Sequence, residues 1–255
     1  MSKVLEFKNK NKQTGKEEVV GTMEIKNQTE EKAELYFYGD ICSSSWVCWE
    51  EEDKCPQDIA DFLKEIENTK EIDIYINSGG GSVFAGLAIY HQLKRHEGFK
   101  TVHVDGIAAS IASVIALAGD KVIIPSAAQF MIHKPWTIGW GNSIELRKLA
   151  DDLDIAEESI LKIYEANLKE GVDIETVKQL MADETWMTGE KAAEYFNIAV
   201  EETQELVACA SQYFNHYKNM PKSMFKNSKK PKDNFIKDES IETLINSVNK
   251  LFEKY

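Results

Sequence analysis

Two consecutive strand–turn–helix units constrain the fold of this chain more than any other feature of its sequence. In the first unit a strand leads into the glycine-rich turn 78–82 and then into a helix. In the second, Gly106 breaks a strand just before an apolar helix that starts at Ser110. Two further strands are expected at 121–125 and 129–133. This alternation predicts an α/β fold in which both turns lie at one edge of a mostly parallel sheet.

A long helix is predicted at 143–170, with Ser143 as its N-cap and Gly171 ending it. At 1.5 Å per residue it is about 40 Å long. Its apolar stripe is too long for one small domain to cover. We therefore expect this helix to pack against another subunit.

Changes in composition set the expected organisation of the chain. The lysine-rich stretch 218–232 is typical of a solvated linker. Apolar residues at helical spacing after it predict an amphipathic helix at 240–254, bound either to its own domain or to a partner. The three expected parts are N-terminal strands and turns at 1–33, the main domain at 34–203 and a C-terminal extension at 204–255.

Charge and cysteine content exclude several classes of function. The formal net charge of −13 argues against nucleic acid and against an anionic membrane surface as partners. No apolar run is long enough to cross a membrane, and the N-terminus lacks the apolar region of a secretion signal, so we expect a cytoplasmic protein. Cysteines 42, 48, 55 and 209 lack zinc-ligand spacing and are expected to be reduced. We expect no metal and no cofactor.

Three positions carry candidate chemistry. The turn Gly79–Gly81 lacks the lysine of a phosphate-binding loop, but it offers backbone amides at a helix start. Ser110 has two interpretations: an N-cap of its helix, or a nucleophile at the positive end of the helix dipole. His133 ends an apolar strand next to that helix, so it can act as a general base for Ser110. With an ordinary histidine pKa, activity would rise with pH through about 6.5.

Three ordered motifs give the chain a recognisable resemblance. They are Y-I-N-S-G-G-G-S-V at 75–83, G-I-A-A-S at 106–110 and M-I-H-K-P at 131–135. Together with the long helix that follows, they resemble the proteolytic subunit of the Clp proteases over about residues 34–203. The resemblance implies a serine endopeptidase that works through an acyl-enzyme. It also implies a crotonase-like ββα superhelix fold, with helix 143–170 as the handle that joins two rings.

The resemblance also implies roles for individual residues. Ser110 would be the nucleophile and His133 the base, with the amides of Gly80 and Ile111 forming the oxyanion hole. Substrate would lie extended between two stretches of backbone, carried by Gly79, Gly81, Ser82 and Val83 on one side and by Pro135 and Trp136 on the other.

The third member of the triad is open between two carboxylates. The family pattern places an aspartate two residues before an aromatic residue, and Trp186 fits that aromatic. Glu184 therefore takes the acid position, with Asp183 as the alternative and a plain solvated loop as a third interpretation. A carboxylate here would hold the tautomer of His133 and stabilise its charged form.

Departures from the housekeeping pattern point to a subgroup. Gly79 replaces the usual proline, the 42–55 connection is rich in tryptophan, and the tail beyond about 204 is additional. These features resemble the Clp-related proteases of phages and prophages, for which processing of capsid or scaffold proteins is proposed. The resemblance implies a polypeptide substrate, a homo-oligomer of stacked heptameric rings, and an ATP-dependent unfoldase or a phage capsid or scaffold protein as candidate partners. A phage-encoded chain would act in the cytoplasm of its bacterial host.

Two other functions remain open at this point. A crotonase-type acyl-CoA enzyme would use the paired amides for an enolate and would not need Ser110 and His133 side by side. A catalytically silent, ring-forming structural subunit would keep the handle helix without a working triad.

Overall fold

The computed structural model describes residues 2–10, 16–41, 56–202 and 208–221. The chain divides into two compact units, Met1–Asn219 and Met220–Tyr255, and every described helix and strand belongs to the first. Cysteines 42, 48 and 55 and the predicted helix 240–254 lie outside the described residues, as does most of the predicted linker 218–232.

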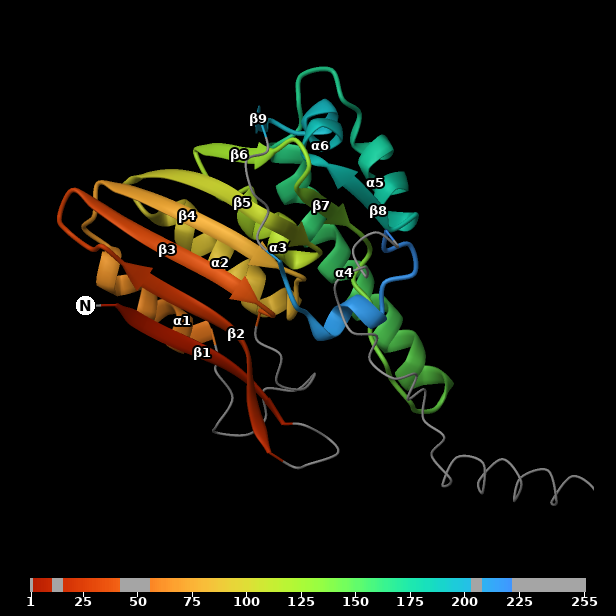
Figure 1. Ribbon diagram of the computed structural model, residues 1–255. Helices are drawn as coiled ribbons and strands as arrows, with labels where there is room; N and C mark the ends of the chain where they lie inside the picture. The colour runs from red at the N-terminus through yellow and green to blue at the C-terminus, as the bar shows by residue number, and fades with distance from the viewer. Residues whose placement is uncertain (1, 11–15, 42–55, 203–207, 222–255) are drawn as a thin grey trace, which may run out of the picture. The chain divides into compact units, whose positions relative to one another are not determined.

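Strands and helices alternate through most of the first unit (Figure 1). In chain order the elements are β1 (Lys3–Lys10), β2 (Glu17–Lys26), β3 (Lys32–Gly39), α1 (Pro56–Leu63), η1 (Lys64–Ile66), β4 (Glu71–Ser78), α2 (Val83–Arg95), β5 (Phe99–Ala109), α3 (Ile111–Ala116), β6 (Lys121–Pro125), β7 (Gln129–Ile132), α4 (Ser143–Ala166), α5 (Ile174–Ala182), β8 (Thr185–Thr188), α6 (Gly189–Tyr195), β9 (Ala199–Glu201) and η2 (Gln212–Asn215).

One mixed sheet organises the unit, in the order β1-β2-β3-β4-β5-β6-β9. The first three strands pair antiparallel, and all later pairs along this path are parallel. Figure 1 shows α1, α2 and α3 in a row against one face of this sheet. The predicted α/β class is confirmed, because strands and helices alternate along the chain and the connecting helices pack on the same side of the sheet.

The two halves of strand β5 pair with different neighbouring strands. Its first half pairs with β6 at Thr101–His103, and its second half pairs with β7 at Ile107–Ala109. The expected break at Gly106 was wrong, because β5 continues through it. The pairing with β4 is nevertheless irregular around Gly106: Ile76 pairs with Val104 and Ser78 with Ala108, so the extra residues of the bulge lie in β5.

Period-two burial explains how the strands form the core. Strands β2 and β3 alternate buried and partly exposed residues, as in a sheet with one covered face. The covered face includes Phe7, Met23, Phe37 and Phe130, all fully buried. On the opposite face, the ring of Tyr75 stacks between Tyr36 and His103 at centroid distances of 4.7 and 5.1 Å.

Helix α4 begins where the sequence predicts, but with a different cap. The side chain of Asn142 accepts hydrogen bonds from the amides of Ile144 and Glu145, and the Glu145 carboxylate accepts one from the Asn142 amide at 2.8 Å. This reciprocal box makes Asn142 the cap instead of Ser143. The helix ends at Ala166 rather than 170, where the Asn167 side chain donates to the carbonyl of Ile163.

The apolar stripe of α4 is only partly covered in the single chain. Ile160, Ile163 and Tyr164 near its end are buried, whereas Ile144 and Ile155 are 76% and 63% exposed. In Figure 1 its first half extends beyond the sheet. Packing against another subunit stays a prediction. Among the described helices, none is both long and apolar enough to cross a membrane.

Candidate active site

Ser110 stands between the end of β5 and the first turn of α3. Its backbone has φ 56° and ψ −129°, a conformation that non-glycine residues adopt only under strain. Its amide donates to the carbonyl of Met131 at 2.9 Å, and its carbonyl accepts from the Ser113 amide and hydroxyl. The side chain makes no capping bond. Ser110 therefore occupies the N-cap position of α3, but the expected side-chain capping bond is wrong, because its hydroxyl is directed elsewhere.

The hydroxyl of Ser110 meets the imidazole of His133. The distance from Oγ to Nε2 is 2.7 Å, a hydrogen bond. His133 directly follows β7, which pairs in parallel with the end of β5, with Met131 opposite Ala109. The sheet thus brings two residues 23 positions apart in sequence into the geometry of a nucleophile and its base.

Burial controls the protonation of His133. Desolvation lowers the pKa of the imidazole to about 4, and the negative charge of Glu184 opposes this shift. The phenol of Tyr217 lies edge-on to the imidazole, at a centroid distance of 5.3 Å, and the phenol in turn packs against Trp186, whose ring centroid is 5.6 Å away. At neutral pH His133 is therefore uncharged and able to accept a proton.

We expect an unusually acidic limb in the pH profile of this site. A base must be neutral, so the rate falls as pH drops through its pKa, which burial places near 4 instead of 6.5. Labelling of Ser110 by a fluorophosphonate should stay nearly constant from about pH 8 to about pH 5 and fall about tenfold per unit below about pH 4. A series of second-order rate constants, with circular dichroism to confirm folding, measures this. An acid limb near 6.5 in the intact chain would contradict it.

Of the two candidate acids, only Glu184 influences the pKa of His133, and neither carboxylate hydrogen-bonds the imidazole. Glu184 has a positive φ of 47° and acts on the His133 pKa through its charge. Its Oε1 accepts the main-chain amide of Asn219 at 2.7 Å. Asp183 caps the end of α5 and accepts the side-chain amide of Gln179. Within the described residues, no carboxylate hydrogen-bonds the His133 ring. Glu184 is thus the better placed acid, although its carboxylate is occupied by Asn219.

The predicted oxyanion donors flank the nucleophile. Ile111 is the first residue of α3, and amides in the first turn of a helix have no intrahelical acceptor. Gly80 has φ 101°, and a Cβ on it would lie 2.7 Å from Cβ of Ser110. Its amide donates to the Ser78 hydroxyl at 3.1 Å in this structure. Holding an oxyanion would therefore require that amide to turn from Ser78.

The predicted substrate-binding residues come from two stretches of the chain, one on each side of Ser110 in sequence. Gly81 forms a bridge with Ile41, and the Ser82 hydroxyl caps α2, which begins at Val83. Gly79 lies against Ser211 and Phe214, and Trp136, next to Pro135, has its ring 5.0 Å from that of His216. Both sides of the expected cleft therefore contact one segment, 208–219, from the C-terminal part of the chain.

Comparison with known proteins decides the family. The Clp protease family model matches residues 24–198, more than half of the 255 residues. The chain belongs to the Clp protease family. As a member of this family it is a serine peptidase, a hydrolase.

Curated relatives support the same assignment. The chain is 36% identical, over 137 residues, to the ATP-dependent Clp protease proteolytic subunit of Ligilactobacillus salivarius (strain UCC118), a match that covers 52% of this chain and 68% of that protein. The subunit of the same name from Leuconostoc citreum (strain KM20) is 33% identical over 139 residues, with the same coverage. The one from Streptococcus salivarius is 36% identical over 143 residues, which make up 52% of this chain and 69% of that subunit.

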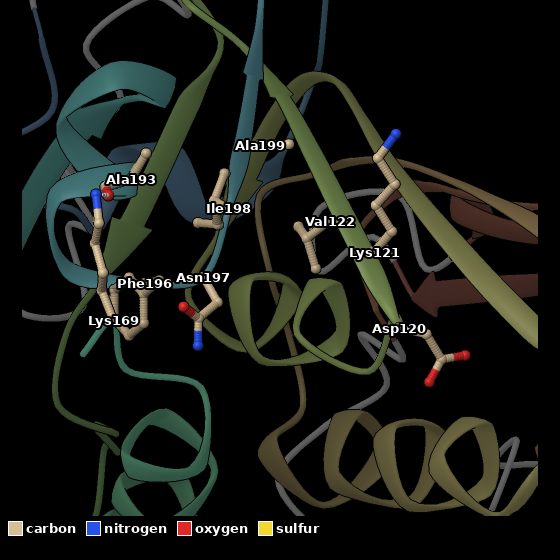
Figure 2. Close-up of a pocket in the computed structure, with 9 residues that line it drawn as sticks. All are labelled: Asp120, Lys121, Val122, Lys169, Ala193, Phe196, Asn197, Ile198 and Ala199. Atoms are coloured by element: carbon tan, nitrogen blue, oxygen red, sulfur yellow. Dashed lines mark hydrogen bonds between the residues drawn. The ribbon is translucent and has the colours of Figure 1, made fainter.

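A separate surface hollow of about 340 Å³ lies away from Ser110. Figure 2 shows the residues that line it, which are Asp120, Lys121, Val122, Lys169, Ala193, Phe196, Asn197, Ile198 and Ala199. The Lys169 ammonium donates to the carbonyl of Ala193 at 3.0 Å. None of these side chains is a serine, cysteine or histidine, so this hollow offers no second hydroxyl, thiol or imidazole. Elsewhere in the described chain, no three metal-ligating side chains gather at one point.

Three residues near the site escaped the sequence reasoning. The Asn77 side chain accepts the amide of Ile107 and donates to the carbonyl of Ala208. Asp40 is 1% exposed, and burial raises its pKa to about 6. Tyr217 is 8% exposed and its hydroxyl donates to the carbonyl of Gly79. For Tyr217, the one available signal in the sequence was the cluster of aromatic residues at 213–217, ahead of a lysine-rich stretch.

Proposed function

We propose that the chain is a serine endopeptidase of the Clp type that cleaves polypeptides through an acyl-enzyme. The observation that carries this proposal is the 2.7 Å hydrogen bond between Ser110 Oγ and His133 Nε2, made by a strained serine at the start of a helix. Strain of this kind persists where the surrounding structure holds a functional geometry. Neither a crotonase-type enzyme nor a silent subunit requires it.

The proposed reaction uses this chain's own groups. Ser110 Oγ attacks the substrate carbonyl carbon while its proton passes to His133 Nε2, and the amides of Ile111 and Gly80 stabilise the oxyanion. The C–N bond then breaks, and the leaving amine takes the proton from His133. A water molecule then attacks the acyl-enzyme ester while its proton passes to His133. The carboxylic acid product leaves, and the proton returns to Ser110. Glu184, with Asp183 as the alternative, would stabilise the imidazolium between these steps.

Intact-mass spectrometry after prolonged fluorophosphonate treatment tests the nucleophile. We expect one adduct on the wild-type chain, none on Ser110→Ala and strongly reduced labelling on His133→Ala. Ser113→Ala is the matched control, because Ser113 is a buried serine one turn away whose hydroxyl bonds Tyr164. An adduct that persists in Ser110→Ala would overturn the assignment.

We also propose that the chain assembles through α4 into stacked heptameric rings. The exposed apolar residues Ile144, Leu146 and Ile155 support this, since a monomer gains nothing by leaving them in water. Native mass spectrometry should show a high-order homo-oligomer. Replacing Ile155 with aspartate should dissociate it, whereas replacing the exposed Lys148 with aspartate should not. A monomeric wild type would contradict the proposal.

The biological setting is proposed from the resemblance to phage and prophage Clp-related proteases. The tryptophan-rich stretch at 42–55 and the additional C-terminal residues support it. In this setting the substrate is a capsid or scaffold protein, the site of action is the cytoplasm of the bacterial host, and an ATP-dependent unfoldase is a candidate partner. Incubating the enzyme with purified capsid and scaffold proteins, and mapping new N-termini, tests it against Ser110→Ala.

A further inference from the structure

The 208–219 segment lies along the cleft in which substrate is expected. Near its start, the carbonyl of Ala208 accepts a bond from the Asn77 side chain at 3.2 Å, and Cys209 Sγ donates to the Asn77 carbonyl at 3.4 Å. Further on, the Gln212 amide donates to the buried carboxylate of Asp40. These contacts fix the segment on the side of the cleft formed by the ends of β3 and β4.

The same segment then crosses to the opposite side. Ser211 and Phe214 lie so close to Gly79 that a Cβ there would clash with both. The ring of His216 packs against Trp136. Because Gly79 and Trp136 come from the two stretches expected to hold substrate, the segment occupies the space between them.

Tyr217 covers the reacting groups themselves. Its ring lies edge-on to His133 and its hydroxyl donates to the Gly79 carbonyl. Burial raises the pKa of this phenol far above its ordinary value, and a hydrogen bond with Ser110 opposes the rise. A scissile carbonyl carbon must come within about 3–3.5 Å of the serine oxygen. Tyr217 places its phenol beside Ser110 and His133, and a phenol has no acyl carbon for the serine to attack.

The last residue of the segment engages the candidate acid. The Asn219 amide donates to Glu184 Oε1 at 2.7 Å, and its side chain donates to the Asp183 carbonyl, also at 2.7 Å. A carboxylate that accepts this amide is turned toward the segment. The segment thus acts on all three triad positions, through Tyr217 at Ser110 and His133 and through Asn219 at Glu184.

We propose that the 208–219 segment is an intramolecular inhibitor of the Ser110 site. This rests on the proposed function, since it assumes that Ser110 is the nucleophile. Docked, the segment excludes polypeptide from the cleft and holds Glu184 away from His133. Released, it opens the cleft, and Glu184 is free to turn toward the imidazole.

The rate of fluorophosphonate labelling of the full chain tests the proposal. It scales with the fraction of molecules whose site is open. Tyr217→Ala should label about tenfold faster than wild type, or more, because the largest buried contact of the segment is lost. Lys218→Ala is the control: it alters the neighbouring exposed residue and should label at the wild-type rate. Equal rates for wild type and Tyr217→Ala would overturn the inhibitory role.

Two further measurements guard against a folding defect in Tyr217→Ala. Tyr217→Phe keeps the ring against His133 and loses the hydroxyl with its hydrogen bonds, so its labelling rate should fall between those of wild type and Tyr217→Ala. A synthetic peptide of residues 208–219 should slow the labelling of Tyr217→Ala, and the same peptide with alanine at position 217 should not. Failure of the native peptide to slow the reaction would overturn the proposal.

The outcomes separate this inference from the proposed function. Equal, Ser110-dependent labelling of every variant would retain the peptidase and remove the inhibitor. No labelling of folded Tyr217→Ala would overturn both, because release should expose the nucleophile. A wild-type chain that is cut within 208–219, while Ser110→Ala stays intact, would make the segment a substrate and also overturn the inhibitor.

Discussion

Replacing Ser110 with alanine is expected to lower peptide hydrolysis by about 10⁴-fold or more, the loss seen when the nucleophile of a serine triad is removed. The physical reason is specific to one atom: Oγ is the group held 2.7 Å from His133 Nε2, and alanine leaves the base with no proton to accept. kcat/KM should be measured on both the native chain and Tyr217→Ala, so that a covered site cannot hide the loss.

The same position offers a test of strain. With φ 56° and ψ −129°, Ser110 is in a conformation that glycine adopts freely. Ser110→Gly should be as inactive as Ser110→Ala, yet more stable than it by about 1 kcal/mol or more. Ser113→Ala should show the reverse, with labelling retained and about 1–3 kcal/mol of stability lost because Tyr164 loses its buried partner. Denaturant midpoints measure both. A glycine variant less stable than the alanine variant would argue against stored strain.

Replacing Gly80 with alanine is expected to give a smaller but still large loss of peptide hydrolysis. A Cβ there would lie 2.7 Å from Ser110 Cβ and 2.8 Å from the Ala109 carbonyl oxygen, at a φ of 101°. The turn must move, and its amide moves with it. Losing one oxyanion donor lowers kcat by about 10²- to 10³-fold, and the strained backbone costs about 1–3 kcal/mol of stability.

Gly171→Ala separates these two effects. Gly171 also has a positive φ, 86°, but an added Cβ would meet nothing within 4 Å. This variant should lose about 1–2 kcal/mol for the left-handed backbone alone and keep full activity. If Gly80→Ala hydrolyses peptides as fast as Gly171→Ala does, the Gly80 amide has no part in catalysis.

The sequence predicted the elements of the sheet because local patterns specify them. The strand–turn–helix order around Ser110, for example, depends on residues close together in the chain. Strand β8 was not predicted, because T-W-M-T is too short to show a periodic pattern. It forms because each of its residues pairs with one in β7, with Trp186 opposite Met131. Tertiary pairing, not propensity, decides such a strand.

The candidate site, like the sheet, could be predicted from the sequence only in part. Ser110 and His133 stood out because each ends a recognisable element, and parallel pairing of β5 and β7 brings them together. Their catalytic roles and the choice between Glu184 and Asp183 stay predictions. Tyr217 could not be foreseen at the site, because its bond to Gly79 spans 138 positions of sequence and depends on the chain returning across the sheet. No periodic pattern encodes such a return.

Covering Ser110 with a segment of the same chain has a consequence for assays. A tethered ligand has a local concentration on the order of millimolar, however dilute the protein is. Dilution of the protein therefore does not release the segment, and a substrate peptide in solution must compete against the local concentration of the segment. The native chain should accordingly show a raised KM with kcat unchanged, and a screen with micromolar peptide would record a competent peptidase as inactive.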